Sequence, residues 1–548
     1  MHILKRLGIA LLSFLVLLGL AAGLGALMDP HWRVEPYQPH ISLPTADTSI
    51  VSRRGLTTTE GHYQTKETHV TVRLSQQVTI NALVREPVDA PGGHPACLFI
   101  HGAGTGRASE VYGDLASALA SAGITTLVPD KRLDTYTTFH RDYPAMAADY
   151  NKSLELLRSW PGVDPSKTGL YSESEGTWIA SVMTANDPQL AFSIMTSPPV
   201  YPGRDQMSMA VSSYLDLIGA PSGLREQIPK LLGLNFAPLG LEYADFDPLP
   251  NWDKLKAPTL VNFGTEDASM PIEQGARELQ ERTKRAGNTN VTVRYYPTNH
   301  QMRVGSRLSK PGLPLEEHYT HNLEDWINAV ALGAQTGDWS TPLVAGSQPR
   351  QLYRVPTSTR AGLVKSIGGL MVLLAASLTL PLLAALGALC LGVAGLARRR
   401  LRGQSSPRAR FGKGISALLW ASGAFGLLTL GALLTYIIFI VARAMSLEPI
   451  NRLQAAYWPA LRVLSLLWLV LLACLVSQLI SNWLQARKSA QPGPSSALMA
   501  CHARQSPHTR SRQPVLARGW GHWLVLILAL LGLVCCLLSF AFWGMFSL

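Results

Sequence analysis

The chain has 548 residues, of which 47% are hydrophobic and 15% charged, and its mean hydropathy is +0.13. Soluble domains contain about 25% charged residues, so this composition argues against a wholly soluble protein, and it excludes a disordered chain, which would be poor in apolar residues. The net charge is +12, but residues 360–548 carry +17 (18 Lys and Arg, one acid) and residues 1–359 carry −5 (30 Lys and Arg, 35 acids), which favours membrane orientation over nucleic-acid binding.

The N-terminal segment is uncharged over residues 7–28 and follows Lys5 and Arg6. A basic start before an apolar run is typical of a signal peptide or a signal anchor. The run is long enough to cross a bilayer and has no clear small-residue cleavage motif. We therefore predict an uncleaved anchor over residues 1–28, with cleavage near Ala26 as the alternative. Residues 29–45, rich in proline and polar side chains, are predicted to be a linker.

Strand and helix patterns alternate through residues 46–334. Residues 68–74 and 77–84 alternate with a period of two and predict a hairpin. Buried strands are then expected at 96–102, 123–129, 167–172, 191–197, 258–264 and 291–296, and helices at 109–121, 143–159, 176–186, 273–286 and 317–333. This alternation predicts an α/β fold with a mostly parallel sheet, helices on both faces, and chemistry at the carboxyl ends of the strands.

Two less regular segments belong to this outer region. Residues 198–257 form a long insert between two predicted strands, and within it residues 224–241 are apolar and partly helical. That segment fits either a cap that lines a substrate pocket or a structural elaboration without substrate contact. Residues 335–360, rich in Gly, Ser, Thr and Pro, are predicted to be a second linker.

The last part of the chain, residues 361–548, is predicted to be a four-helix transmembrane region. Its uncharged stretches lie at about 366–397, 414–442, 463–486 and 519–548, and each exceeds the roughly 20 residues that cross a bilayer as a helix. Buried helices of soluble domains rarely run so long without a charge. The lipid bilayer is therefore an expected partner.

The loops between these stretches predict the orientation. Residues 398–413 and 487–518 are rich in Arg and Lys and contain no acid, whereas residues 443–462 hold three arginines and Glu448. Loops rich in basic residues stay in the cytoplasm. The expected protein is thus a multi-pass protein of the inner or plasma membrane, with residues 29–360 on the periplasmic or extracellular side.

Cysteine usage gives no sign of a metal or a cofactor. The outer region has a single cysteine, Cys97, in an apolar run that suits core packing, and the other five are spread over the predicted membrane helices and a loop. This spacing fits no zinc site. We expect no cofactor.

A candidate nucleophile lies in the sequence SESEG at residues 172–176, between a predicted strand and a predicted helix. A nucleophile elbow needs small residues two before and two after the nucleophile, and Ser172 and Gly176 stand there around Ser174. The alternative is a helix N-terminus capped by Ser174 or Ser172. The flanking Glu173 and Glu175 are expected to be solvated, with binding of a substrate amine as the alternative.

The other two members of a catalytic triad are found at later strand ends. Asp267, in GTED at 264–267, follows one predicted strand, and its alternative role is a turn or helix cap. His300, in YPTNH at 296–300, follows the next; His318 and His321 are rivals, but both lie in or at a predicted helix. The chain order Ser, Asp, His, each at a strand end, is far more specific than any one motif.

A glycine-rich turn, HGAGTG at residues 101–106, completes the set. It places backbone N–H groups near the nucleophile, so Ala103 and Glu175 are the candidate oxyanion-hole donors. A phosphate-binding loop is disfavoured because the turn lacks both a Gly-Lys-Ser/Thr ending and the G-x-G-x-x-G spacing.

With these motifs the chain resembles the α/β-hydrolase superfamily, and within it the bacterial dienelactone-hydrolase and prolyl-oligopeptidase-like branch. The similarity covers about residues 60–333 and rests on HGAGTG, PDKR (129–132), SESEG, GTED and YPTNH; Ser172 departs from the usual glycine. It implies that Ser174 attacks an acyl carbonyl, that His300 transfers the proton, and that Asp267 orients the imidazole.

The expected function is a membrane-anchored serine hydrolase that cleaves an ester, thioester or amide bond of a small-molecule, lipid or peptide substrate. One alternative is a membrane acyltransferase that uses the same triad. Another is a non-catalytic sensor or binding module, although none of the three triad residues is missing.

Overall fold

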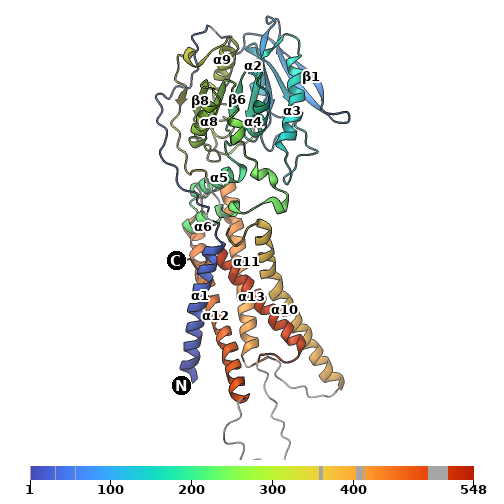
Figure 1. Ribbon diagram of the computed structural model, residues 1–548, viewed down its shortest axis with the longest axis vertical. Coiled ribbons are helices and arrows are strands. Elements are labelled where there is room, and N and C mark those ends of the chain that lie inside the picture. The colour runs from blue at the N-terminus through green and yellow to red at the C-terminus, as the bar shows by residue number, and fades with distance from the viewer. Residues whose placement is uncertain are drawn as a thin grey trace, which may run out of the picture.

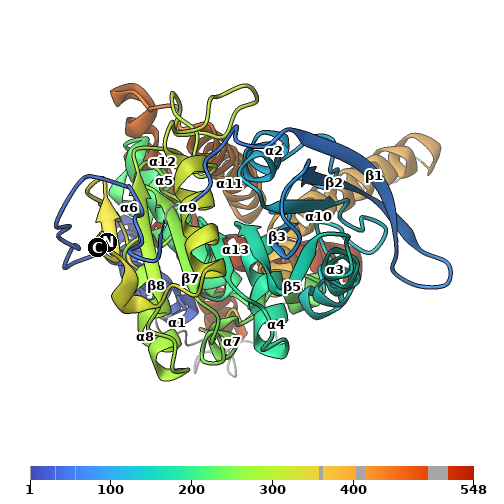
Figure 2. The same cartoon turned by 90° about the horizontal axis from the view of Figure 1, so that it is seen from above.

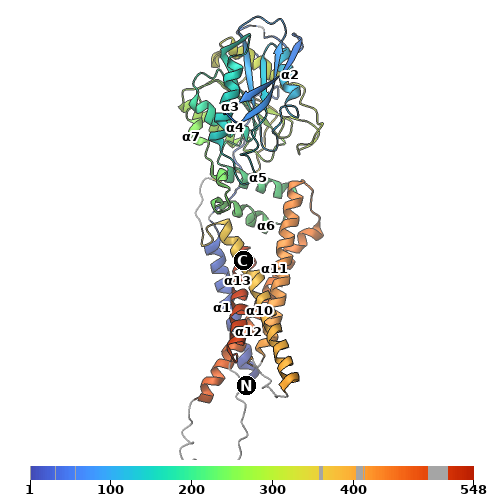
Figure 3. The same ribbon diagram turned by 90° about the vertical axis from the view of Figure 1, so that its right-hand side faces the viewer.

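The computed structural model describes residues 2–30, 32–55, 57–356, 362–402, 411–412, 414–490 and 516–547. Figures 1 and 3 show an elongated molecule, with an α/β region at one end and long helices at the other. We call these long helices the apolar bundle: α1 (His2–Met28), α10 (Ile367–Arg402), α11 (Ile415–Met445), α12 (Arg452–Ala490) and α13 (Trp520–Phe542).

The α/β region is built on one nine-stranded sheet. Its order is β1-β2-β4-β3-β5-β6-β7-β8-β9. The strands are β1 (Thr65–Arg73), β2 (Thr79–Pro87), β3 (His94–Ile100), β4 (Thr125–Pro129), β5 (Val163–Glu173), β6 (Ser193–Thr196), β7 (Thr259–Gly264), β8 (Val291–Tyr296) and β9 (Val344–Gly346). The β1–β2 and β2–β4 pairs are antiparallel and every other pair is parallel, which confirms the predicted mostly parallel sheet.

Helices cover both faces of the sheet (Figure 2), as the sequence predicts. One face packs against α2 (Gly113–Ser121) and α9 (Tyr319–Ala331). The other face packs against α3 (Tyr143–Arg158), α4 (Gly176–Asn186) and α8 (Gln274–Arg285). Successive strand residues point to opposite faces, so β3 gives Phe99 to the first core and Leu98 to the second.

Two segments that read as linkers from sequence are folded against this region. Within residues 335–360, the short helix η4 (Thr336–Asp338) is followed by β9, which extends the sheet beside β8. Within residues 29–45, the main-chain N–H of Ile41 donates to Glu273 at 2.5 Å. Their composition predicted linkers, but pairing with β8 and the contact with buried Glu273 order the described parts of both segments.

The insert at 198–257 joins the α/β region to the apolar bundle. It contains α5 (Gly203–Leu217), α6 (Ser222–Gln227), η1 (Pro229–Gly233), η2 (Ala237–Leu239), η3 (Glu242–Asp245) and α7 (Leu249–Trp252). Its buried side chains Leu215, Ile218 and Leu224 belong to the same hydrophobic cluster as the bundle helices. Buried Lys230 donates to the main-chain carbonyl of Phe542 at the end of α13. The apolar residues of 224–241 therefore pack against the bundle, which favours the structural reading of that segment.

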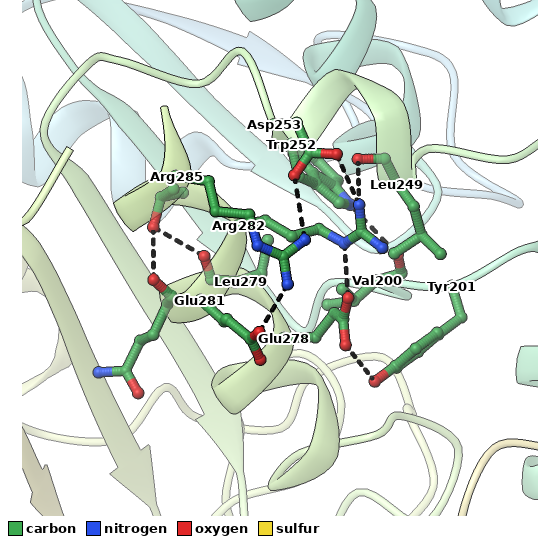
Figure 4. A network of polar contacts seen from close by, with 12 residues as sticks. Val200, Tyr201, Leu249, Trp252, Asp253, Glu278, Leu279, Glu281, Arg282 and Arg285 are labelled. Atoms are coloured by element: carbon green, nitrogen blue, oxygen red, sulfur yellow. Dashed lines mark hydrogen bonds and ion pairs between the residues drawn. The ribbon is translucent and has the colours of Figure 1, made fainter. Parts of the chain in front are cut away.

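The far end of the insert is tied to α8 by polar contacts (Figure 4). Arg282 pairs with Asp253 at 2.7 Å and with Glu278 at 2.5 Å. Arg285 reaches the same aspartate and also Glu281. This network fixes the chain just before it enters β7, the strand that leads to Asp267.

All five helices of the apolar bundle are long and apolar enough to cross a membrane. Helix α10 packs along α13, α11 along α12, and α1 beside α12 and α13. Pro381 lies inside α10, and a Cβ atom on the facing Gly532 of α13 would come within 2.6 Å of its ring. The third helix, α12, begins at residue 452 rather than near 463 and contains Pro459. The predicted basic loops at 398–413 and 487–518, and the second linker from residue 357, lie mostly outside the described residues.

Candidate active site

Ser174 occupies the sharp turn between β5 and α4. Its φ of +52° lies in the left-handed region, which non-glycine residues adopt uncommonly and which a nucleophile elbow requires. A Cβ atom on Gly176 would lie 2.6 Å from the carbonyl oxygen of Ile100, so only glycine fits there. Ser172 lies inside β5 and donates to the carbonyl of Ile194 at 3.0 Å. Helix α4 starts after Glu175 without a side-chain cap, so the capping alternative for both serines is wrong.

Asp267 and His300 are brought together by the loops that follow β7 and β8. The Nδ1 atom of His300 lies 2.7 Å from Oδ2 of Asp267. The other carboxylate oxygen, Oδ1, accepts the Ser269 N–H at 2.8 Å and its hydroxyl at 2.6 Å. Helix α8 is preceded by Glu273, so Asp267 is not its cap. Asp267 therefore forms a tight turn and also holds the imidazole.

Asp267 and His300 each stabilise the charged form of the other. Burial acts to raise the pKa of Asp267, but the His300 imidazole and the hydrogen bonds from His300 and Ser269 outweigh it and leave that pKa below its usual value. Burial acts to lower the pKa of His300, but the Asp267 carboxylate outweighs it and raises that pKa above 6.5. Asp267 is thus held ionised next to an imidazole of increased basicity.

The end of β6 connects the serine turn with the histidine loop. The N–H of Ser174 donates to the carbonyl of Thr196 at 2.9 Å. The next residue, Ser197, donates its hydroxyl to the carbonyl of His300 at 2.7 Å. Adjacent residues of β6 and its following loop therefore touch both partners, which positions Ser174 and His300 at the same edge of the sheet. No sequence motif pointed to Ser197.

The rival histidines have structural partners. His318 precedes α9, and His321 within α9 contacts Glu324 at 2.8 Å. His101 is buried, its Nε2 lies 2.6 Å from the carbonyl of Pro129, and burial lowers its pKa to about 4. A neutral, enclosed His101 supports the glycine-rich turn rather than exchanging protons.

The glycine-rich turn after β3 lies against the serine turn. A Cβ atom on Gly102 would lie 3.3 Å from the Cβ of Ser174, and buried Lys131 donates to the Gly102 carbonyl at 2.5 Å. Within the described part of the chain, the N–H groups of Ala103 and Glu175 have no hydrogen-bond acceptor. Both are therefore available to an incoming oxyanion.

The Glu175 side chain points into the protein, contrary to the expectation of a solvated charge. It is 4% exposed and accepts from Arg141 at 2.5 Å, Tyr143 at 3.0 Å and Tyr136 at 2.7 Å. Lys131 adds an ion pair at 3.6 Å, although burial lowers the pKa of this lysine to about 8. These partners, which the sequence did not reveal apart from the PDKR motif, fix the residue after Ser174.

A cleft of about 650 Å³ opens beside these groups, lined by residues that include Ala103, Tyr112, Glu173, Gln301 and Arg303. No residue of the insert lines it, within the part of the chain that the structure describes. Polar and charged side chains such as Glu110 and Asp114 share this lining with apolar ones such as Val111, Leu115 and Leu315. Glu173 and Gln301, the chain neighbours of Ser174 and His300, line it, whereas the three triad residues are not among its lining residues.

Comparison with known proteins shows that part of the chain is similar to a family. Residues 149–327, which include Ser174, Asp267 and His300, match the family described as BAAT / Acyl-CoA thioester hydrolase C terminal. No curated protein matches the chain.

Several solved structures are similar to part of the chain. The Pyrococcus furiosus esterase Pf2001 is 16% identical, covers 49% of this chain and 91% of its own, and gives a TM-score of 0.32. Est1E from Butyrivibrio proteoclasticus is 14% identical over 48% of this chain and 98% of its own, with a TM-score of 0.34. The Pyrococcus horikoshii acylaminoacyl peptidase is 16% identical over 43% of this chain and 37% of its own, with a TM-score of 0.31.

The parallel sheet with helices on both faces and the family match over residues 149–327 agree with the resemblance found in the sequence. The α/β region thus has an α/β-hydrolase-like fold, and residues 149–327 are similar to an acyl-CoA thioester hydrolase family.

Proposed function

We propose that this protein is a membrane-anchored serine hydrolase that cleaves an ester, thioester or amide bond through Ser174, His300 and Asp267. The observation that carries the proposal is the 2.7 Å contact between His300 Nδ1 and the buried carboxylate of Asp267. A buried acid that holds one imidazole nitrogen leaves the other, Nε2, to accept a proton. The left-handed Ser174 turn at the same edge of the sheet supplies the nucleophile.

The proposed reaction has two halves. Ser174 Oγ bonds to the acyl carbonyl carbon while its proton passes to His300 Nε2, and the oxyanion accepts hydrogen bonds from the N–H groups of Ala103 and Glu175. The bond to the leaving group then breaks, and His300 returns the proton to that group. In the second half His300 takes a proton from water while the water oxygen bonds to the acyl carbon. The bond from that carbon to Ser174 Oγ then breaks, His300 returns the proton to Oγ, and the acid leaves.

The matched family suggests the first bonds to test. Its description names acyl-CoA thioester hydrolases, so acyl thioesters are the first substrate class that we propose for this chain. Simple esters come second because the same triad chemistry cleaves both.

The anchoring is also a proposal. The α/β region lies at one end of the apolar bundle and the N-terminus at the other (Figure 1). Arg398 and Arg400, close to the end of α10, lie in the part of the sequence that is rich in basic residues. Basic residues at the N-terminal end favour the cytoplasm for that end and the periplasmic or extracellular side for the hydrolase. Alkaline phosphatase fused at the C-terminus should therefore be active, and an inactive fusion would reverse the proposed orientation.

Labelling with a fluorophosphonate tests the catalytic proposal. Membranes that contain the wild-type chain should become labelled on Ser174, mapped by mass spectrometry, and those with Ser174→Ala should not. Ser172→Ala is the matched control, because Ser172 lies inside β5 and should leave labelling intact. A folded wild type that stays unlabelled would contradict the proposal and favour the non-catalytic alternative.

A further inference from the structure

The charged side chains that line the cleft beside Ser174 differ in whether they have a partner of opposite charge. Arg303 is already occupied, because its guanidinium contacts Asp114 at 2.7 Å and the carbonyl of Leu313 at 2.8 Å. Glu110 is exposed and pairs with Arg107 at 3.5 Å. Lys310 is exposed as well. The charged groups at the edge of the cleft therefore either pair with each other or face water.

Glu173 differs from these groups. It directly precedes Ser174, lines the cleft and is only 7% exposed. Among the residues that the structure describes, no lysine, arginine or histidine forms an ion pair with it. Its hydrogen-bonding partner is the neutral side chain of Gln301, and the charges of His300 and Arg303, which are paired with Asp267 and Asp114, act on it only from a greater distance. Burial raises the pKa of Glu173. A buried carboxylate without a cation is costly, and a cation from outside would compensate it.

The two glutamates of the SESEG motif therefore have different surroundings. Glu175 is fully engaged by Arg141, Tyr136 and Tyr143, and it does not line the cleft. Glu173 lines the cleft and is the residue directly before Ser174. An acyl group bonded to Ser174 would remain next to Glu173 in both halves of the reaction, whereas the leaving group departs after the first.

We propose that Glu173 binds an ammonium group in the acyl part of the substrate, so that the enzyme prefers acyl groups with a free amine a few bonds from the carbonyl. The turnover test rests on the proposed serine hydrolase function. A carboxylate–ammonium hydrogen bond in a water-poor site is stronger than a neutral one and discriminates against an acylated amine.

The test compares the 4-nitrophenyl esters of alanine and of N-acetylalanine with the full-length protein in detergent. We expect the wild type to give a higher kcat/KM for the alanine ester. Glu173→Gln should lower the ratio of the two kcat/KM values by about 10- to 100-fold, because it removes the charge and keeps the shape. Glu110→Gln, which removes an exposed carboxylate at the same cleft, should leave the ratio unchanged. A ratio that Glu173→Gln does not change would overturn the proposal.

A second measurement does not need turnover. In the Ser174→Ala background, alaninamide should raise the thermal unfolding midpoint more than N-acetylalaninamide does, and Glu173→Gln should abolish that difference. Equal effects of the two amides would contradict the amine site even if esters are hydrolysed. Selective binding of alaninamide without ester hydrolysis or fluorophosphonate labelling would support the site and refute the catalytic proposal.

Discussion

The α/β region and the apolar bundle are held together by different physical means. In the α/β region, buried polar groups determine the geometry: Glu175 is surrounded by four donors, and Asp267 accepts three hydrogen bonds. In the bundle, close approach of small residues to large ones dominates, as where Gly532 meets Pro381 and Gly426 meets Trp468. In the membrane that we propose for the bundle, apolar surface gives little driving force between helices, so packing shape matters more there. Polar substitutions should therefore damage the first region, and added volume the second.

The largest effect should come from the acid of the triad. Asp267→Asn keeps the shape of the side chain but removes the charge that holds the His300 Nδ1–H, so we expect a fall of about 10⁴-fold in kcat. Ester hydrolysis by the purified protein measures it. Asp89→Asn, in an exposed turn, is the control. A loss below about tenfold would remove Asp267 from the mechanism.

Added volume at the serine turn should be the next most severe change. Gly176→Ala places a methyl group 2.6 Å from the Ile100 carbonyl oxygen and 2.8 Å from that of His101. Backbone atoms cannot move aside as a flexible side chain would, so we expect a loss of about 3 kcal/mol in the free energy of unfolding. Thermal unfolding in detergent measures it. Gly92→Ala, which meets no atom within 4 Å, should be nearly neutral.

A glycine-to-alanine substitution in the bundle should lower the free energy of unfolding by less. Gly532→Ala brings a methyl group within 2.6 Å of Pro381 Cδ, and we expect a loss of about 1–2 kcal/mol because helices α10 and α13 can separate slightly. Gly431→Ala, with nothing within 4 Å, is the matched control in α11. Activity should persist in both variants. If Gly532→Ala abolished activity at full stability, the distinction between the two regions would fail.

The smallest expected effect is a shift in the pH dependence of the activity. His300 must be neutral to act as a base, and Asp267 raises its pKa above the ordinary 6.5. Activity should therefore fall on acidification with a midpoint above 6.5, since protonation of His300 begins at a higher pH than in a free imidazole. The pH profile of kcat/KM for a neutral ester measures the midpoint. Ser197→Ala removes a hydrogen bond to the His300 carbonyl and not to its ring, so it should leave that midpoint in place.

The sequence was most informative where a pattern has one structural solution. Continuous apolar runs predicted strands β3 to β8, because the hydrophobic pattern restricts the secondary structure. The small residues on either side of Ser174 predicted its tight turn, because larger side chains would not fit there. Strand β9 was missed because three residues in a Gly- and Ser-rich stretch form a strand only through their partner β8.

Contacts between residues that are distant in the sequence explain the other differences between the prediction and the structure. The sequence could not distinguish Glu173 from Glu175, because their opposite surroundings depend on Arg141 and Tyr143 far along the chain. Likewise, the apolar residues of the insert look the same whether they line a pocket or pack on a neighbouring helix.

Helix α5 contacts both regions. Gln206, near its start, donates to the carbonyl of Ser269 beside Asp267, and Leu215, near its end, is buried among the bundle helices. If the α/β region were expressed without the bundle, the apolar side chains of Leu215, Ile218 and Leu224 would therefore become exposed to solvent. Such a fragment would need detergent although it retains none of the five long apolar helices.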